Sequence, residues 1–297
     1  MPGQQTPSKR ARSAEWWLTL PSFGWLLIFF IIPSLIIFVI SFRAADVTGG
    51  VSGKWTLANW SAWLHPDVRV LSVRTVWMSA VATCICLALA IPMAWFMARC
   101  SAAWRNVLLL LVVIPFWTNF LIRIFAWKVL LNQDGLMTRL ARMLGLIGDQ
   151  DSLLYTPGAV LLVLVYTHLP FAILPLYAAA EKFDFSLLDA ARDLGATASR
   201  AFFSVFIPGI GAGISAAALL VFVPALGCYL IPDIVGGHES DMLGNRIAQR
   251  AFSDRNLPEA SALASGLALA VIIIAALLWS RQRAGVQSEM KNVTKVT

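Results

Sequence analysis

Long uncharged stretches alternate with short charged segments along the whole chain. The uncharged runs extend over 17 to 32 residues, and a helix needs about 20 apolar residues to cross the hydrocarbon core of a membrane. Hydrophobic and polar residues do not alternate with a period of two in these runs, which excludes a membrane β-barrel. The pattern predicts six membrane-spanning helices, over residues 22–42, 75–98, 107–131, 157–180, 209–232 and 260–280.

Composition agrees with this pattern and excludes two other classes of protein. Hydrophobic residues make up 59% of the 297 residues, charged residues make up 13%, and the mean hydropathy is +0.74. About a quarter of the residues in a soluble domain are charged, and a disordered chain lacks this much apolar mass. The predicted fold class is therefore an all-α integral membrane protein with six transmembrane helices.

The distribution of Lys and Arg predicts which side of the membrane each loop faces. With six spans, both tails lie on the side of the second and fourth loops, and these four segments carry 12 basic and 6 acidic residues. The other three loops carry 9 basic and 10 acidic residues. Because basic residues concentrate in cytoplasmic loops, we expect a cytoplasmic N-terminal tail (1–21) before an uncleaved first span, a transmembrane domain (22–280) and a cytoplasmic C-terminal tail (281–297). The net charge of +7 then reflects orientation in the lipid bilayer, and a nucleic-acid partner is not expected.

Residue types that carry out catalysis or bind metals are scattered along the sequence. The four Cys residues lie in or beside the apolar stretches, which argues against a disulfide framework, and the three His residues form no cluster with metal-ligand spacing. The sequence has neither a P-loop, the Gly-x-x-x-x-Gly-Lys-Ser/Thr motif that binds nucleotide phosphates, nor a Gly-x-Ser-x-Gly nucleophile motif. We therefore expect a chain that is not an enzyme and has no metal site and no cofactor of its own.

The loop between the fourth and fifth predicted spans, 181–208, has a helical pattern of its own. Ser186 and Asp189 have the spacing of a capping box, which predicts a helix start at Ser186. Apolar residues at helical spacing would then share one face, namely Leu187, Leu188, Ala191 and Leu194. Gly195 is placed to end this helix in the left-handed conformation, and a second short helix over 198–207 would end at the next proline. Such a helix pair either presents a surface to the cytoplasm or packs under its own bundle as a connector.

The same loop resembles a motif of one transporter family. Its segment Asp189-Ala-Ala-Arg-Asp-Leu-Gly-Ala196, followed after a gap by Phe206-Ile-Pro208, is similar to the EAA loop of ABC importer permeases. In that family the loop forms a coupling helix that docks into a cleft on the ATPase subunit. The resemblance implies an ATPase-coupling role for Ser186, Leu187, Leu188, Asp189, Ala190, Ala191, Asp193 and Gly195.

Three further segments resemble one branch of these permeases, which transports spermidine and putrescine. The segments are 114–127, 220–227 with 231–237, and 242–247 with 256–263. The resemblance implies the MetI-like permease fold, polyamines or a related small organic solute as cargo, and a place in the bacterial inner membrane. One position departs from the pattern, because many polyamine permeases carry an acidic residue after the Gly of the fifth span, where this chain has Cys228.

Few polar residues lie within the predicted spans, and some of them are candidates for a substrate path. The candidates are Trp117, Asn119, Arg123, Cys228, Tyr229 and Asp233. Asn119 and Arg123 are four residues apart and would share a face of the third span. An arginine within a membrane faces the bundle interior or a cavity; alternatively, Arg123 lies near the outer interface and snorkels, or pairs with a carbonyl group or with an acid of a partner subunit. The aromatic candidates can stack on a cationic or planar ligand, although abundant aromatic residues also face lipid.

The predicted function is that of a permease subunit in a binding-protein-dependent ABC importer. The resemblance implies several partners: a second, related permease subunit, two ATPase subunits that bind ATP and Mg²⁺, and a periplasmic solute-binding protein. An ion-coupled secondary transporter or channel is the alternative, and that class shows ionisable groups near the membrane midplane and often inverted repeats. The sequence shows no such repeat, so the ABC importer is favoured.

Overall fold

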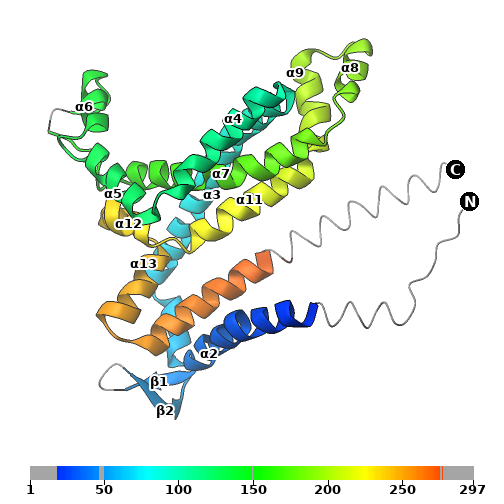
Figure 1. Ribbon diagram of the computed structural model, residues 1–297. Helices are drawn as coiled ribbons and strands as arrows, with labels where there is room; N and C mark the ends of the chain where they lie inside the picture. The colour runs from blue at the N-terminus through cyan, green and yellow to red at the C-terminus, as the bar shows by residue number, and fades with distance from the viewer. Residues whose placement is uncertain (1–18, 47–49, 149, 275, 277–297) are drawn as a thin grey trace, which may run out of the picture. The chain divides into compact units, whose positions relative to one another are not determined.

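The computed structural model describes residues 19–46, 50–148, 150–274 and 276. The chain divides into two compact units, one comprising residues 1–65 and 249–297 and the other Pro66–Ala248. Helices dominate both units (Figure 1). The predicted C-terminal tail and most of the predicted N-terminal tail lie outside the described residues, and residues 19–21, assigned to that tail, are already helical.

Within the described residues, four helices are long and apolar enough to cross a membrane by themselves. They are Thr19–Ile40, α3 (Pro66–Arg99), α7 (Pro157–Glu181) and Leu257–Ile274. Two further pairs of helices pass the same test only together, because one pair is bent by 93° and the other by 69°. These pairs are Ala102–Trp117 with Phe120–Met143, and Ala198–Gly209 with Gly211–Leu226. The described chain has four spans, or up to six if each bent pair is one span, in agreement with the predicted helical membrane class.

The third predicted span is broken, so the prediction of one helix over 107–131 is wrong. The chain forms α4 (Ala102–Val113) and a 3₁₀ turn η3 (Ile114–Trp117), and a new helix α5 (Phe120–Leu131) follows. Pro115 removes a backbone donor at the end of α4. The Asn119 side chain then accepts a hydrogen bond of 2.8 Å from the Leu121 amide and so starts α5 in a new direction.

The fifth predicted span is also interrupted. In place of one helix over 209–232, α11 (Gly211–Leu226) ends at Gly227, and α12 (Leu230–Val235) begins three residues later. The chain continues through a short 3₁₀ turn η5 (His238–Ser240), α13 (Leu243–Ala248) and a π-helical turn η6 (Gln249–Ser253). The Tyr155 amide donates to the Val235 carbonyl at the end of α12 over 2.9 Å, and the Leu243 amide at the start of α13 donates to the Thr75 hydroxyl over 2.7 Å.

Small residues bring α3, α7 and α11 close together in the core of the second unit. The alanines that are fully inaccessible on these helices are Ala82, Ala90, Ala94, Ala172, Ala180, Ala217 and Ala225. A Cβ atom at Gly213 would collide with the side chain of Ala179. Lipid gives helices no hydrophobic reason to associate, so close approach through small residues supplies the van der Waals packing that holds these three helices.

The first unit contains a short β-hairpin in addition to its helices, which the all-α prediction did not include. The helix Thr19–Ile40 consists of an initial segment, a π-helical turn η1 (Leu27–Ile31) and α2 (Ile32–Ile40). In its most apolar window of 18 residues nothing is buried. The strands β1 (Arg43–Ala45) and β2 (Val51–Trp55) then pair antiparallel, with Arg43 opposite Trp55.

The 3₁₀ helix η2 (Ala58–Leu64) follows the hairpin and contacts both of the longer helices of the first unit. The Asn59 amide group donates to the carbonyl oxygens of Ser41 and Arg43 over 2.9 and 2.7 Å. The Trp63 indole N–H donates to the Ala262 carbonyl over 3.2 Å. Two side chains of η2 therefore tie the end of α2 and the helix Leu257–Ile274 to one short element.

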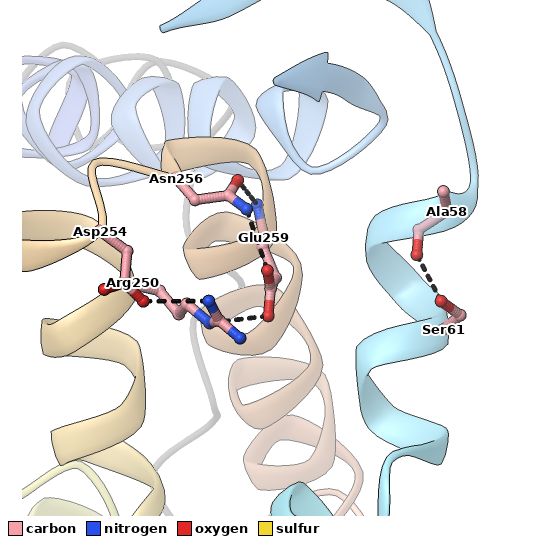
Figure 2. A network of polar contacts seen from close by, with 6 residues as sticks. All are labelled: Ala58, Ser61, Arg250, Asp254, Asn256 and Glu259. Atoms are coloured by element: carbon pink, nitrogen blue, oxygen red, sulfur yellow. Dashed lines mark hydrogen bonds and ion pairs between the residues drawn. The ribbon is translucent and has the colours of Figure 1, made fainter. Parts of the chain in front are cut away.

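The helix Leu257–Ile274 begins at a reciprocal cap, shown in Figure 2. The Asn256 side chain accepts from the Glu259 amide over 3.2 Å, and its NH₂ group donates to the Glu259 carboxylate over 2.9 Å. Arg250 forms ion pairs with Glu259 over 2.9 Å and with Asp254 over 3.0 Å. This closed polar network fixes the start of the helix, because every carboxylate in it has a partner.

Candidate coupling surface and membrane pocket

The helix α8 (Ser186–Asp193) starts where the sequence predicted, but its cap is different. The Ser186 amide donates to the Asp184 carboxylate over 3.0 Å, and Phe185 precedes the helix in a helical conformation. The predicted capping box of Ser186 and Asp189 is therefore wrong, because a carboxylate two residues before Ser186 already satisfies the first free donor. Hydrogen bonds from the Ser186 side chain and amide hold the pKa of the Asp184 carboxyl below its ordinary value.

Gly195 ends α8 in the left-handed conformation, as predicted, with φ of +89°. The Gly195 amide donates to the Arg192 carbonyl over 2.8 Å, and the Ala196 amide donates to the Ala191 carbonyl over 3.0 Å. This pair of bonds is a Schellman motif. Among the described residues, no atom lies within 4 Å of a Cβ built on Gly195, apart from its own neighbours. A larger residue at this position would therefore meet a backbone cost within this chain and no steric one.

The predicted second helix follows α8 directly and is continuous up to a bend in the chain. It consists of α9 (Ala198–Ala201), a π-helical turn η4 (Phe202–Phe206) and α10 (Ile207–Gly209). The Thr197 hydroxyl caps it by accepting from the Arg200 amide over 3.3 Å. The chain bends by 69° after Gly209 and continues as α11. The proline at the end of the predicted helix is tolerated inside it, because it occupies the first turn of α10.

The apolar residues of α8 do not share a single face. Leu188 is buried at 6% exposure and Ala191 is half-buried, whereas Leu187 is 50% exposed and Leu194 is 90% exposed. Successive residues of a helix are 100° apart, so the predicted stripe is wide enough for one edge to pack inward while the other faces out. The outer edge, which we call the α8 outer face, consists of Leu187, Ala190 and Leu194.

Aromatic rings pack the α8–α9 pair against the end of α3. The Trp95 ring lies 4.5 Å from the Phe206 ring, 5.0 Å from the Phe202 ring and 5.6 Å from the Phe185 ring. Phe206 is completely buried. This cluster was not predicted, although Phe183 and Phe185 precede the first predicted helix, Phe202 and Phe206 lie within the second, and a tryptophan stands near the end of the second span. These rings, which we call the aromatic seat, pack the α8–α9 pair closely against α3.

Two charged contacts border the aromatic seat. The Arg99 guanidinium lies 5.0 Å from the centre of the Trp95 ring, and Arg105 forms an ion pair of 3.3 Å with Glu181 at the end of α7. A hollow of about 430 Å³ opens between α3, α8 and η4, and Arg99 and Arg192 both line it. The surface around α8 therefore combines exposed apolar side chains with basic groups, which suits docking of a partner with acidic and apolar residues.

A second cavity, of about 340 Å³, lies among α3, α4, η3, α5 and α7. Its walls are apolar except for Arg123 and Tyr166. The Arg123 guanidinium lies 5.1 Å from the centre of the Phe116 ring and 5.8 Å from that of Phe120. Its Nε atom is buried without a hydrogen-bond partner. We call this cavity the Arg123 pocket.

The structure separates Arg123 from the other candidates for a substrate path. None of the other five lines the Arg123 pocket. Trp117 is exposed at the break before α5, and Asn119 uses its side chain to cap that helix. Cys228 and Tyr229 lie in the turn between α11 and α12, and Asp233 is exposed on α12. The predicted shared face of Asn119 and Arg123 does not form one site.

The fold of this chain matches that of chains in solved structures of bacterial ABC transporters. A bacterial ABC transporter involved in the import of the acidic polysaccharide alginate superimposes with a TM-score of 0.73 at 15% identity, over 92% of this chain and 96% of that chain. A bacterial alginate ABC transporter in complex with an alginate pentasaccharide-bound periplasmic protein gives a TM-score of 0.62 at 14% identity, over 90% and 93% of the two chains. The fold is thus that of an ABC importer permease.

Sequence comparison then gives the family. The chain belongs to the binding-protein-dependent transport system inner membrane components, whose family profile matches residues 87–282. Members of this family are inner-membrane transport components and not enzymes. The matched region begins within α3, so the helix Thr19–Ile40 and the hairpin lie outside it.

Several curated relatives are similar over most of the chain. The spermidine/putrescine transport system permease protein PotB of Haemophilus influenzae is 39% identical over 262 residues, which cover 88% of this chain and 91% of PotB. PotB of Escherichia coli K12 is 36% identical, covering 88% and 94%. The inner membrane ABC transporter permease protein YdcU of E. coli K12 is 33% identical, covering 78% and 76%.

Proposed function

We propose that this chain is a permease subunit of an ATP-driven importer of polyamines. The identity of 36–39% with the PotB proteins over 88% of the chain carries the proposal. Cys228 lies in the turn after α11, at the position where many polyamine permeases carry an acidic residue. Because Cys228 offers no carboxylate to a cationic polyamine, recognition would depend on other groups of the importer. Spermidine and putrescine are the solutes to test first.

The α8–α9 pair would couple transport to ATP hydrolysis. The α8 outer face is unpartnered, its end is fixed by the Schellman motif, and the aromatic seat connects it to α3. Docking of this face into an ATPase subunit would bury Leu187, Ala190 and Leu194. Closure of two ATPases on ATP and Mg²⁺ would then move α8, and the aromatic seat would pass the movement to the membrane helices.

The assembly would contain this chain, a second permease subunit, two ATPase subunits and a periplasmic solute-binding protein in the bacterial inner membrane. ATP and Mg²⁺ would bind only to the ATPase subunits. The excess of Lys and Arg supports an orientation in which both tails and α8 face the cytoplasm. The end of the second unit that carries α12 and α13 would then face the periplasmic protein, as Figure 1 places it opposite to α8.

Reconstitution in liposomes tests the proposal. The complex purified through a tag on this chain is inserted into vesicles, and uptake of radiolabelled spermidine and putrescine is measured with ATP and the periplasmic protein present. Uptake that needs both supports the proposal. Uptake driven by an ion gradient without ATP would contradict the importer mechanism, and ATP-dependent uptake of another solute only would contradict the polyamine cargo.

A further inference from the structure

We propose that the Arg123 pocket receives a membrane helix of the second permease subunit, and that this helix inserts a carboxylate beside the guanidinium. The proposal rests on the two-permease assembly proposed above. It removes Arg123 from the set of cargo-binding candidates and makes it a contact between subunits. It also requires the second permease to be a different polypeptide.

The immediate surroundings of Arg123 leave its charge without a counter-ion. Two aromatic faces, those of Phe116 and Phe120, attract the guanidinium, but neither accepts hydrogen bonds as a carboxylate does. Guanidinium has five N–H donors, and the Nε donor is buried and unused. No carboxylate of the described residues lies within ion-pair distance of Arg123.

The depth of the pocket makes this missing counter-ion costly. The pocket also involves Tyr166, Leu169, Pro170 and Ile173, which lie along the middle of α7. At a rise of 1.5 Å per residue these positions are about 14 to 24 Å from the first residue of that helix. The alternative that places Arg123 near the outer interface counted depth along one straight helix, whereas the chain bends by 93° before α5 and Arg123 lines a pocket beside the middle of α7. A charge at such depth requires a partner or a water-filled cavity.

The lining and the depth of the pocket leave one kind of counter-ion for Arg123, a carboxylate carried by an apolar helix. A phospholipid phosphate lies at the membrane surface, roughly 15 Å from the midplane, and does not reach the middle of α7. A hydrated polar solute needs polar walls, and Tyr166 is the only polar side chain of the lining besides Arg123. The rim is apolar and open, since Phe96 is 60% exposed and Leu111 is 58% exposed. An apolar helix that carries one Asp or Glu fits both the rim and the charge.

A second copy of this chain cannot supply that carboxylate. All acidic residues in the sequence lie outside the central parts of the apolar stretches. Asp233 is the acidic residue closest in sequence to the turn between α11 and α12, but Val235, two residues later, is bonded to Tyr155 just before α7. Asp233 therefore lies at the end of α7 and not at its middle. The partner that fills the Arg123 pocket must have an acidic residue within a membrane helix, and this chain has none.

Substitution of Arg123 tests whether its charge holds the second permease in the complex. The complex is purified through a tag on this chain, and the recovered second permease and ATPase are quantified. Arg123→Gln should reduce recovery of the second permease about tenfold, because it leaves the partner carboxylate buried without a counter-ion. Arg123→Lys should retain most of it, and Arg139→Gln, on an exposed part of α6 (Leu136–Met143), should leave it unchanged. The isolated Arg123→Gln chain should be at least as resistant to heat as wild type, which a merely structural role for Arg123 would not give.

Photocrosslinking identifies the occupant. A benzoylphenylalanine at position 96 or 111 should crosslink to a peptide of a different polypeptide with an Asp or Glu in an apolar segment. Crosslinks only to lipid or to another copy of this chain would overturn the proposal, and so would full recovery of the second permease with Arg123→Gln. If the wild-type chain purifies with ATPase but with no other permease, or with no ATPase at all, the proposed assembly itself is wrong, and that result is visible before any variant is made.

Discussion

Two short helices of this protein, α6 and α8, have almost the same construction. Each has eight residues and ends at a glycine in the left-handed conformation, Gly145 with φ of +68° and Gly195 with φ of +89°. Each end is a Schellman motif. In both, the amides of the glycine and of the residue after it donate to two carbonyls of the last turn, and the second of these carbonyls belongs to Ala141 or Ala191. Each helix also leaves leucines exposed to its surroundings. Local geometry alone therefore does not distinguish a coupling helix from a surface helix.

The two helices differ in what lies beneath them. α8 rests on the aromatic seat, which connects it to α3. α6 is held by two polar contacts: Thr138 donates to the carbonyl of Leu131, the last residue of α5, over 2.8 Å, and Arg142 donates to the Asp151 carbonyl in the following loop over 2.8 Å. α8 thus packs on a membrane helix through aromatic rings, whereas α6 is hydrogen-bonded to the end of α5 and to a loop. The two helices therefore differ in their supporting contacts, which their own sequence patterns do not show.

The largest expected difference between α6 and α8 is the side of the membrane from which each can be labelled. With the four native cysteines replaced, a single cysteine at Met143 should react with a membrane-impermeant maleimide added to intact cells, because Met143 is 82% exposed and belongs to α6, which lies away from α8 at the other end of the second unit in Figure 1. A single cysteine at Leu194 should react only after the membrane is opened. Labelling of both positions from outside would place α8 on the wrong side for an ATPase.

The next contrast comes from replacing the two glycines. Gly195→Val and Gly145→Val each impose about 1–2 kcal/mol of backbone strain, and neither Cβ meets a neighbour in this chain. Gly195→Val should lower ATP-driven uptake about tenfold, because a misplaced residue at a docking centre costs a further 2 kcal/mol or so. Gly145→Val should leave uptake near the wild-type rate. Uptake is normalised to the amount of inserted protein.

Equal losses for the two valine variants would indicate a general folding defect, and the assignment of α8 as the coupling helix would lose its support. Normal uptake with Gly195→Val and the ATPase still bound would contradict that assignment directly. Recovery of the ATPase with the tagged chain separates loss of docking from loss of coupling after docking.

A smaller effect is expected from the aromatic seat. Trp95→Ala should uncouple the importer, so that bound ATPase hydrolyses ATP while uptake falls severalfold, because loss of a large ring costs about 3 kcal/mol of packing. Trp95→Phe should restore part of the coupling. Trp104→Ala is the matched control, since Trp104 is exposed on α4 and contacts none of these rings. A Trp95→Ala variant with wild-type uptake per ATP would show that α8 moves independently of α3.

The smallest effect concerns the start of α8. Asp184→Ala should increase amide hydrogen exchange in the first turn of α8 severalfold, and Asp184→Asn should retain most of the protection, because an amide oxygen also caps a helix. The pKa of Asp184 is lowered in the folded chain, so the charged cap contributes stability at neutral pH. That contribution is lost only as the pH falls through the lowered value, in the acid range. Unchanged exchange in Asp184→Ala would mean that the cap is dispensable.

The order of the helices could be read from the uncharged runs, but their breaks could not. The break at 114–119 and the turn at Gly227 both lie inside apolar segments, and hydropathy does not register a change of direction. Pro115 followed by Asn119 was a usable signal, because a proline and an N-cap residue so close together favour a new helix.

Helix caps show a second limit of the sequence pattern. The spacing at Ser186 and Asp189 matches a capping box that the structure does not use, while Asn256 and Glu259 form a reciprocal cap that the analysis did not recognise. Glu reaches back to the N-cap residue more easily than Asp, because its side chain is longer by one methylene. The Gly195 turn was predicted correctly, since a single residue type satisfies its backbone geometry.

The first helix, Thr19–Ile40, has a consequence for how the chain is made. It has the highest mean hydropathy of the four long helices, 2.8, and its apolar window buries nothing against the rest of the chain. A segment with no interior contacts to form can leave the translocation machinery and enter lipid as soon as it emerges from the ribosome. Lys9, Arg10 and Arg12 precede it, and because basic residues favour the cytoplasmic side, we expect them to set its direction at that moment. We then expect the later helices to take their orientation from a segment that enters lipid without first burying its apolar window.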